Sequence, residues 1–163
     1  MLTVTLTALT PTTHRIAFVR ADGSRDQADL DTRSFLVHDL LHFAVKSEAG
    51  FARAFFGRIA AGESCRAVAD GKMAPMTPAA DNQAWLAEMM VGPLTPVARG
   101  QPLPPGFIAG LSQMFTVHAV LPPAWLTDAF IARVLERFRN LNGRRKSTPF
   151  GQPMTLEFAP ALV

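Results

Sequence analysis

Apolar and polar residues alternate at the start of the chain. Between residues 2 and 8, leucine, valine and alanine take every second position with threonines between them, which is the period of a strand with one buried face. The β-favouring run 14–20 continues this character, and Asp22-Gly23 after it suits a tight hairpin turn. The polar segment 25–31 is then expected to return along the edge of the sheet. The pattern predicts an antiparallel meander of three strands.

Helical periodicity replaces this alternation after residue 31. The second helix lies between two glycines, the third begins at a Thr-Pro pair, and the last has the clearest apolar face. The expected helices cover about 33–49, 51–61, 77–92, 107–120 and 122–142. The stretch 93–106 holds five of the 13 prolines and is expected to be an extended connection.

A second alternating segment, 154–158, is expected to pair with the sheet that the N-terminus begins. Together these elements predict an α+β fold, with a small antiparallel sheet of about four strands, three N-terminal and one C-terminal, packed with about five helices. A chain of 163 residues, 48% of them hydrophobic, can bury one sizeable core. We therefore expect a single domain over residues 1–163.

Composition narrows the class of protein. Only 18% of residues are charged and phenylalanine is abundant, which is the opposite of the composition of disordered chains. Cys65 is the only cysteine, so an internal disulfide is excluded and a reducing compartment is expected. The N-terminus lacks the pattern of a signal peptide, and prolines interrupt the longest uncharged stretch, 100–127. The sequence favours a soluble cytoplasmic protein with no membrane partner.

Two histidines stand four residues apart on the first expected helix, His38 and His42, within the sequence H-D-L-L-H. Side chains at this spacing are neighbours on a helix surface and can bind one ion. The pattern resembles the H-E-x-x-H motif of zinc peptidases, in which the intervening glutamate is the general base. Here Asp39 stands in that position with a shorter side chain. The resemblance covers five residues and implies a divalent metal ion such as zinc.

A helical projection puts His38, His42 and Lys46 on a polar flank, away from the side that builds the core. The histidines are therefore expected to face solvent or a groove, with Asp39 too far round the helix to lie between them. A metal site needs at least a third ligand. His118 is the first candidate, followed by Glu88, Asp81, His14 and Cys65.

The same histidines are also compatible with simpler roles. They could be ordinary surface or groove residues, one of them bonded to a carboxylate, or they could serve acid–base chemistry, because histidine titrates near neutral pH. The sequence pairs them with no nucleophile. Cys65 shows no activating partner and is expected to be a partly buried free thiol.

Basic residues gather near the C-terminus. The segment 133–146 has six basic residues and one acidic residue, so it carries a formal charge of +5 in a chain of net charge +3. Favourable contact with a helix C-terminus explains part of this pattern. Arg137, Arg144, Arg145 and Lys146 are candidate contacts for an anion or a partner.

Three functions remain from the sequence, and whether the protein is an enzyme stays open. The first is a divalent-metal or small-ligand site at His38 and His42. The second is a non-catalytic protein-interaction or homo-oligomerising domain that uses the Phe-rich helices and the basic end. The weakest is nucleic-acid binding through 133–146, because Phe138 there belongs to the apolar face and no exposed aromatic accompanies the charge. Nucleotide-binding and serine-hydrolase motifs are absent from the sequence.

Overall fold

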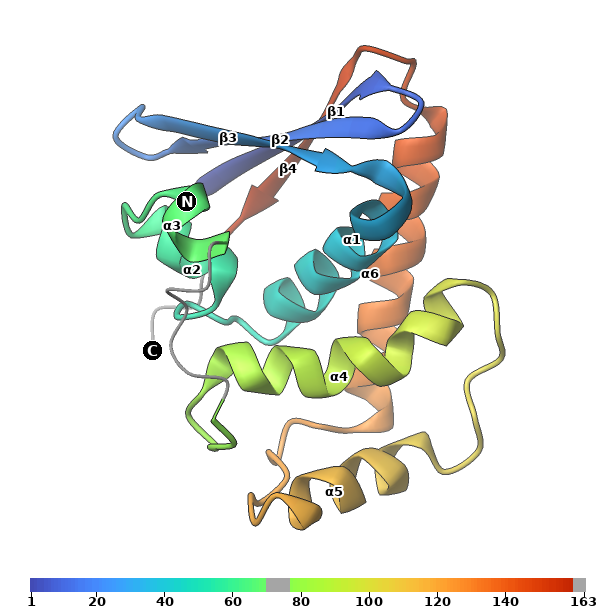
Figure 1. Ribbon diagram of the computed structural model, residues 1–163. Helices are drawn as coiled ribbons and strands as arrows, with labels where there is room; N and C mark the ends of the chain where they lie inside the picture. Colours follow the sequence, from blue (N-terminus) through green and yellow to red (C-terminus); the bar gives the residue numbers. More distant parts are fainter. Residues whose placement is uncertain (70–76, 160–163) are drawn as a thin grey trace.

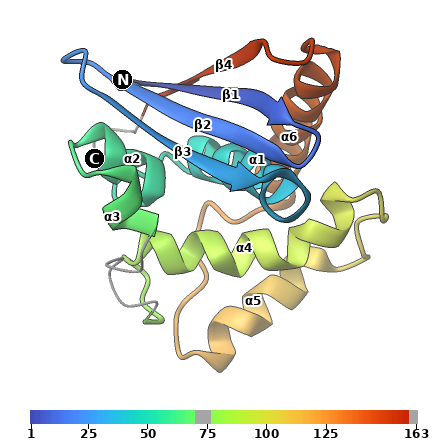
Figure 2. The same ribbon diagram turned by 45° about the horizontal axis from the view of Figure 1, so that its top comes forward.

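The computed structural model describes residues 1–69 and 77–159. Their strands form one sheet in the order β3-β2-β1-β4, and every neighbouring pair is antiparallel (Figure 2). The strands are β1 (Leu2–Thr10), β2 (Thr13–Arg20), β3 (Arg25–Asp31) and β4 (Pro153–Phe158). The predicted α+β fold, with three N-terminal strands and one C-terminal strand, is confirmed.

The sheet buries one face. Alternate residues of β1, β2 and β4 are buried, while the strand β3 at the edge has no fully buried residue. The strand residues in the hydrophobic core are Leu2, Val4, Leu6, Ile16, Phe18, Met154, Leu156 and Phe158. The two-residue period read from the sequence therefore reports this buried face correctly, and β3 lies at the edge as predicted.

The described part of the chain has six helices, and they lie on the side of the sheet that carries these core residues. They are α1 (Thr32–Glu48), α2 (Phe55–Ala60), α3 (Cys65–Ala69), α4 (Gln83–Ala98), α5 (Phe107–Val117) and α6 (Asp128–Ser147). Figure 1 shows α1 and α6 beneath the sheet, α4 beyond α1, and α5 farthest from the sheet. The short helix α3 is the one that the sequence did not predict. Among the described residues, none of the helices is both long and apolar enough to span a membrane.

Helix α1 is buried over most of its circumference in its second half. Leu40, Leu41, Phe43, Ala44 and Val45 are all buried, and the helix packs against both α4 and α6. These side chains spread over more than a single stripe, which means that α1 has neighbours on several sides.

Glu48 joins the end of α1 to α6. Its carboxylate accepts hydrogen bonds from Arg133 Nε at 3.2 Å and from Arg137 Nε at 2.6 Å. One carboxylate thus holds two guanidinium groups that stand one turn apart on α6.

Helix α4 differs from its prediction at both ends. It begins at Gln83, where the Asn82 side chain accepts a hydrogen bond from the Trp85 N–H at 3.2 Å and so caps the helix. It then continues past Gly92 to Ala98 with Pro93 and Pro96 inside it. An interior proline costs a helix about 3 kcal/mol, and here packing offsets the cost, because Leu94 is buried and Val97 and Ala98 pack against the core.

Helix α6 also continues beyond its predicted end at 142. The helix runs to Ser147, so the basic cluster lies in its last turns rather than in a loop. The hydroxyls of Ser147 and Thr148 both donate to the Arg144 carbonyl, at 3.0 and 2.7 Å. The Thr148 N–H donates to the same carbonyl at 2.9 Å, so these three bonds close the last turn of the helix, and the cationic side chains favour the same end of the helix dipole.

Replacement of Phe158 by alanine should test how far β4 holds the sheet to the helices. The Phe158 ring is fully buried, with centroids 6.1 Å from Phe43 and 5.5 Å from Phe56. We expect Phe158→Ala to lower the free energy of unfolding by about 3–5 kcal/mol in urea denaturation. The neighbouring exposed variant Glu157→Ala should stay within about 0.5 kcal/mol of the original protein. A loss below about 1 kcal/mol for Phe158→Ala would contradict this role.

Candidate metal centre

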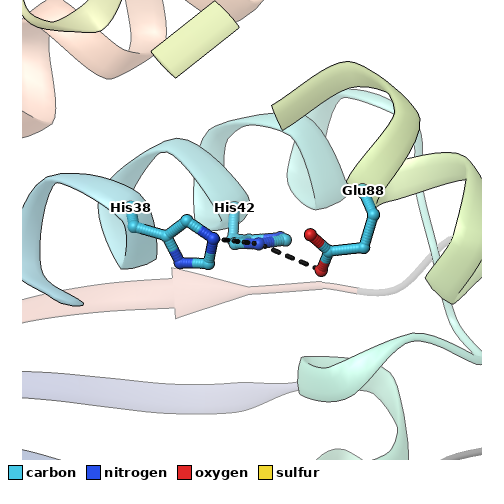
Figure 3. A group of neighbouring side chains, drawn as sticks. All are labelled: His38, His42 and Glu88. Carbon is cyan, nitrogen blue, oxygen red and sulfur yellow. Dashed lines mark hydrogen bonds and ion pairs between the residues drawn. The ribbon is translucent and has the colours of Figure 1, made fainter. Parts of the chain in front are cut away.

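Three metal-binding side chains meet where α1 crosses α4. His38 and His42 come from α1 and Glu88 comes from α4, and their donor atoms lie within 4.8 Å of one another. His42 Nε2 lies 3.1 Å from His38 Nε2 and 3.2 Å from Glu88 Oε1. Figure 3 shows both imidazoles on one side of α1 and the Glu88 carboxylate directed toward His42. We call these three residues the His–His–Glu cluster.

The sequence brings the cluster together in two ways. The four-residue spacing places the two imidazoles one above the other on α1, with ring centroids 4.3 Å apart. Glu88 arrives through packing, because the buried residues Trp85 and Met89 hold α4 against the core beside α1. The histidine pair is thus a local feature, whereas the third member depends on the arrangement of two helices.

The spacing of the donors suits a single metal ion. An ion bound to His38, His42 and Glu88 would have metal–ligand bonds of about 2.1 Å. With such bonds, the separations of 3.1 Å between the two Nε2 atoms and 3.2 Å between His42 Nε2 and Glu88 Oε1 correspond to ligand–metal–ligand angles of about 95–100°. Such angles lie between those of octahedral and tetrahedral coordination. Two donors on one ion can be at most about 4.2 Å apart at these bond lengths, so at most a small side-chain adjustment brings all three into range.

Burial keeps His42 uncharged. Its side chain is only 7% exposed, and burial, assisted by the positive charge of Lys46, lowers the pKa of His42 to about 4. Burial tends to raise the pKa of Glu88, but the contact with His42 and the charges of Lys46 and His38 together outweigh it, and the pKa ends below its usual value. A neutral imidazole beside an ionised carboxylate is the protonation state that a metal ion requires of its ligands.

Asp39 and His14 form a second polar pair, on the Nδ1 side of His38. Asp39 Oδ1 is 3.8 Å from His38 Nδ1, and Asp39 Oδ2 is 3.6 Å from Nε2 of the fully buried His14. The His14 Nδ1 atom in turn lies 3.4 Å from the Thr32 hydroxyl. Burial opposes ionisation of Asp39, yet the two histidines keep its pKa below the usual value. At these distances Asp39 makes charge contacts with the two rings rather than hydrogen bonds.

A pocket of about 230 Å³ opens beside the cluster. Its apolar wall comes from β2, β3 and α2, and consists of Ile16, Ala28, Leu30, Phe55 and Phe56. The polar end of the pocket is lined by the three cluster residues, Asp39 and Lys46. The volume is below the range of about 300–1,000 Å³ that is usual for small-molecule pockets, so only a small ligand fits.

Lys46 is buried in this pocket. Its side chain is 6% exposed, and Nζ lies 5.6 Å from the centroids of both the Phe55 and Phe56 rings. Burial lowers the pKa of Lys46 to about 8, while the charges of Glu88 and Asp39 partly oppose that shift. The ammonium therefore remains mostly charged at neutral pH.

The polar flank of α1 is less exposed than the sequence predicted. His38 is half-buried and faces the pocket, as expected for a groove, but His42 and Lys46 are buried. The expectation failed for these two residues because α4 and the edge of the sheet cover that side of α1. Asp39 lies beside His14 rather than between the two imidazoles, in agreement with its position round the helix.

The other candidate ligands lie in different surroundings. His118 is exposed at the end of α5, with its ring 5.6 Å from that of Trp85. Asp81 is exposed just before α4, and Cys65 is buried, with burial raising the pKa of its thiol to about 11. Within 1–69 and 77–159, the donor that joins His38 and His42 is Glu88, the second candidate from the sequence, rather than His118.

Arg137 and Arg144, two of the four basic candidates, have polar contacts in the part of the chain that the structure describes. Arg137 is paired with Glu48, and the Arg144 guanidinium donates to the Thr155 carbonyl at 2.8 Å. Arg145 is half-buried and Lys146 is exposed on the last turns of α6. An open groove of about 420 Å³ follows this helix, lined by Arg133, Arg137 and Arg144 but also by Glu48 and Glu136. The charge there is mixed, and the basic end contributes to the packing of α6.

Comparison with known proteins identified no relative of this chain. No family model, curated protein or solved structure matches this chain. The contacts and charges of the site itself therefore carry the functional argument.

The burial of Lys46 predicts a change in stability. A fall in pKa from 10.5 to about 8 corresponds to a cost on the order of 3 kcal/mol for the charged form. Lys46→Met should therefore raise the free energy of unfolding by about 1–3 kcal/mol at pH 7, measured by urea denaturation. The exposed control Lys146→Met should change it by less than about 0.5 kcal/mol.

The same pKa predicts how this gain depends on pH. Between pH 8 and 10.5 the unfolded chain keeps a proton on Lys46 that the folded chain has lost. The free energy of unfolding of the original protein therefore rises with pH in this window relative to Lys46→Met. The advantage of the variant should shrink from pH 8 to pH 10. A variant less stable than the original at pH 7, or a gap that widens with pH, would contradict the assignment.

Proposed function

We propose that His38, His42 and Glu88 bind one divalent transition-metal ion, and that the protein uses this ion to act on a small molecule in the adjoining pocket. The observation that carries the proposal is the convergence of three donor atoms from two helices within 4.8 Å. A set of three protein ligands leaves at least one coordination position for water or substrate, which is typical of catalytic rather than structural metal sites.

The donor set favours particular ions. Two imidazoles and one carboxylate are used for zinc in hydrolytic enzymes and for iron(II) in oxygenases. Zinc binds nitrogen and oxygen donors more tightly than iron(II) does, so it is the ion of choice for a first titration. An ion in this cluster would polarise a substrate oxygen or lower the pKa of a bound water. Asp39 lies on the Nδ1 side of His38, so the ring presents Nε2 to the cluster.

The arrangement is more than an ion pair between two helices. A histidine–glutamate contact would need His42 and Glu88 alone, yet His38 Nε2 also lies 3.1 Å from His42 Nε2. Two imidazole nitrogens at this distance need a proton or a cation between them. The N–H of one neutral imidazole can fill this gap, and a metal ion can fill it while also binding the Glu88 carboxylate.

Metal titration tests the proposal directly. We expect untagged protein to bind one zinc ion per chain in calorimetry. Glu88→Gln should weaken the affinity by about tenfold or more, because an amide cannot supply the carboxylate charge, and His42→Ala should abolish binding in the same range. The matched control His118→Ala removes an exposed imidazole outside the cluster and should keep the affinity of the original protein.

Two results would overturn the metal site. One is the absence of zinc, iron(II), nickel or manganese binding to protein that has never met a chelator. The other is equal loss of affinity in His118→Ala and His42→Ala, since that would place the ion at another site. Circular dichroism of each variant separates loss of metal from loss of fold.

A second candidate function is association through α5 and the segment that follows it. Val117 is 76% exposed and Leu121 is 85% exposed, and Met114, one turn before Val117 on α5, is exposed as well. Large apolar side chains that gather on a surface mark contact sites between proteins. This surface differs from the one that the sequence predicted, because the phenylalanines of α2 and α6 are largely buried.

Light scattering tests this second candidate. If α5 mediates self-association, the protein should be a dimer or larger species that persists at high salt, because the contact is apolar. Val117→Asp combined with Leu121→Asp should shift it to the monomer, while Lys146→Asp on α6 should leave it unchanged. A monomer at every concentration reached by the original protein would contradict self-association.

A further inference from the structure

The Lys46 ammonium group faces the pocket beside the His–His–Glu cluster. Lys46 lines the pocket and is 6% exposed, and in the part of the chain that the structure describes no carboxylate lies within 4.0 Å of its Nζ. Its Nζ lies over the faces of Phe55 and Phe56, 5.6 Å from each ring centroid. Cation–π contact offsets only about 1–2 kcal/mol of the loss of hydration. A buried charge of this kind is normally paired.

The charge of the pocket depends on the metal. The charged groups that line it are Asp39, Glu88 and Lys46, so the empty pocket has a formal charge of minus one when both histidines and the Cys65 thiol are neutral. A divalent ion in the cluster changes this charge to plus one. A single negative charge on a ligand would then balance the pocket, and Lys46 offers that charge three hydrogen-bond donors.

We infer that the pocket binds a small organic monocarboxylate, with its carboxylate between the metal ion and Lys46 and its apolar body along Ile16, Leu30 and Phe55. The inference rests on the proposed metal site and names the class of ligand that this site accepts. The apolar wall excludes a fully polar anion, since nothing there replaces its hydration. The volume of about 230 Å³ limits the ligand to a short alkyl or single-ring body.

Lys46 is a positioning and specificity residue in this arrangement rather than a metal ligand. An ammonium beside the metal would favour a carboxylate over an alcohol of the same length, because charge-assisted hydrogen bonds are roughly twice as strong as neutral ones. The metal and the carboxylate would also bind cooperatively. Each ligand then raises the affinity for the other by the same factor, and coupling between sites typically amounts to about 5–150-fold.

Calorimetry with hexanoate as the probe tests the inference, after zinc binding has been measured on the same samples. We expect zinc-loaded protein to bind hexanoate at least about fivefold more tightly than metal-free protein. Lys46→Met should lose about tenfold or more in hexanoate affinity and keep its zinc affinity within about threefold. The control Lys146→Met should behave as the original protein, and hexanol should bind at least about tenfold more weakly than hexanoate.

Each contrary result has a distinct meaning. Normal zinc binding with no uptake of hexanoate overturns the carboxylate site and leaves the metal site standing. Equal hexanoate affinity in Lys46→Met and the original protein, or equal affinity for hexanol and hexanoate, overturns the role of Lys46. Tighter binding of inorganic phosphate than of hexanoate overturns the organic carboxylate as the ligand. Failure to bind zinc overturns the metal site and, with it, the inference.

Discussion

The packing of α1 between the sheet, α4 and α6 is the constraint on which the rest of the structure depends. A helix with neighbours on several sides must bury polar as well as apolar side chains, and α1 buries His42 and Lys46 together with Leu40 and Phe43. Buried polar groups are costly unless they have partners. The contact of His42 with Glu88 follows directly from this requirement, and the cluster of charged groups arises where apolar packing is interrupted.

The apolar packing of α4 explains why a carboxylate is available at that point. Residues on the buried side of α4 press it against the core, and Glu88 follows one turn after Trp85 on the same helix. The remaining space becomes the pocket, bounded by aromatic side chains of α2 and by the edge of the sheet. The same contacts that stabilise the fold therefore fix the distance between the donors, which is what a metal ion would need.

The sequence predicted the features that depend on local patterns. Two-residue alternation located β1 and β4, and four-residue spacing placed His38 beside His42. The contacts between α1 and α4 were beyond it. Glu88 ranked behind His118 because single-chain spacing contains no information on how α4 crosses α1, and the prolines concealed the second half of that helix. The polar flank looked solvent-exposed for the same reason, since the elements that cover it come from other parts of the chain.

Lys46 connects the energetics of the fold with the proposed chemistry. A hydrophobic residue of similar length would fill its place at lower cost, because the pocket wall around its side chain is aromatic. The charges of Glu88 and Asp39 offset only part of the cost of burying an ammonium there. The cost of burying Lys46 is explained if a ligand supplies a negative charge beside the ammonium. A metal ion in the neighbouring His–His–Glu cluster would attract such a ligand. The two features explain each other: three donors without an anion leave an open metal position, and a buried ammonium without an anion remains unpaired.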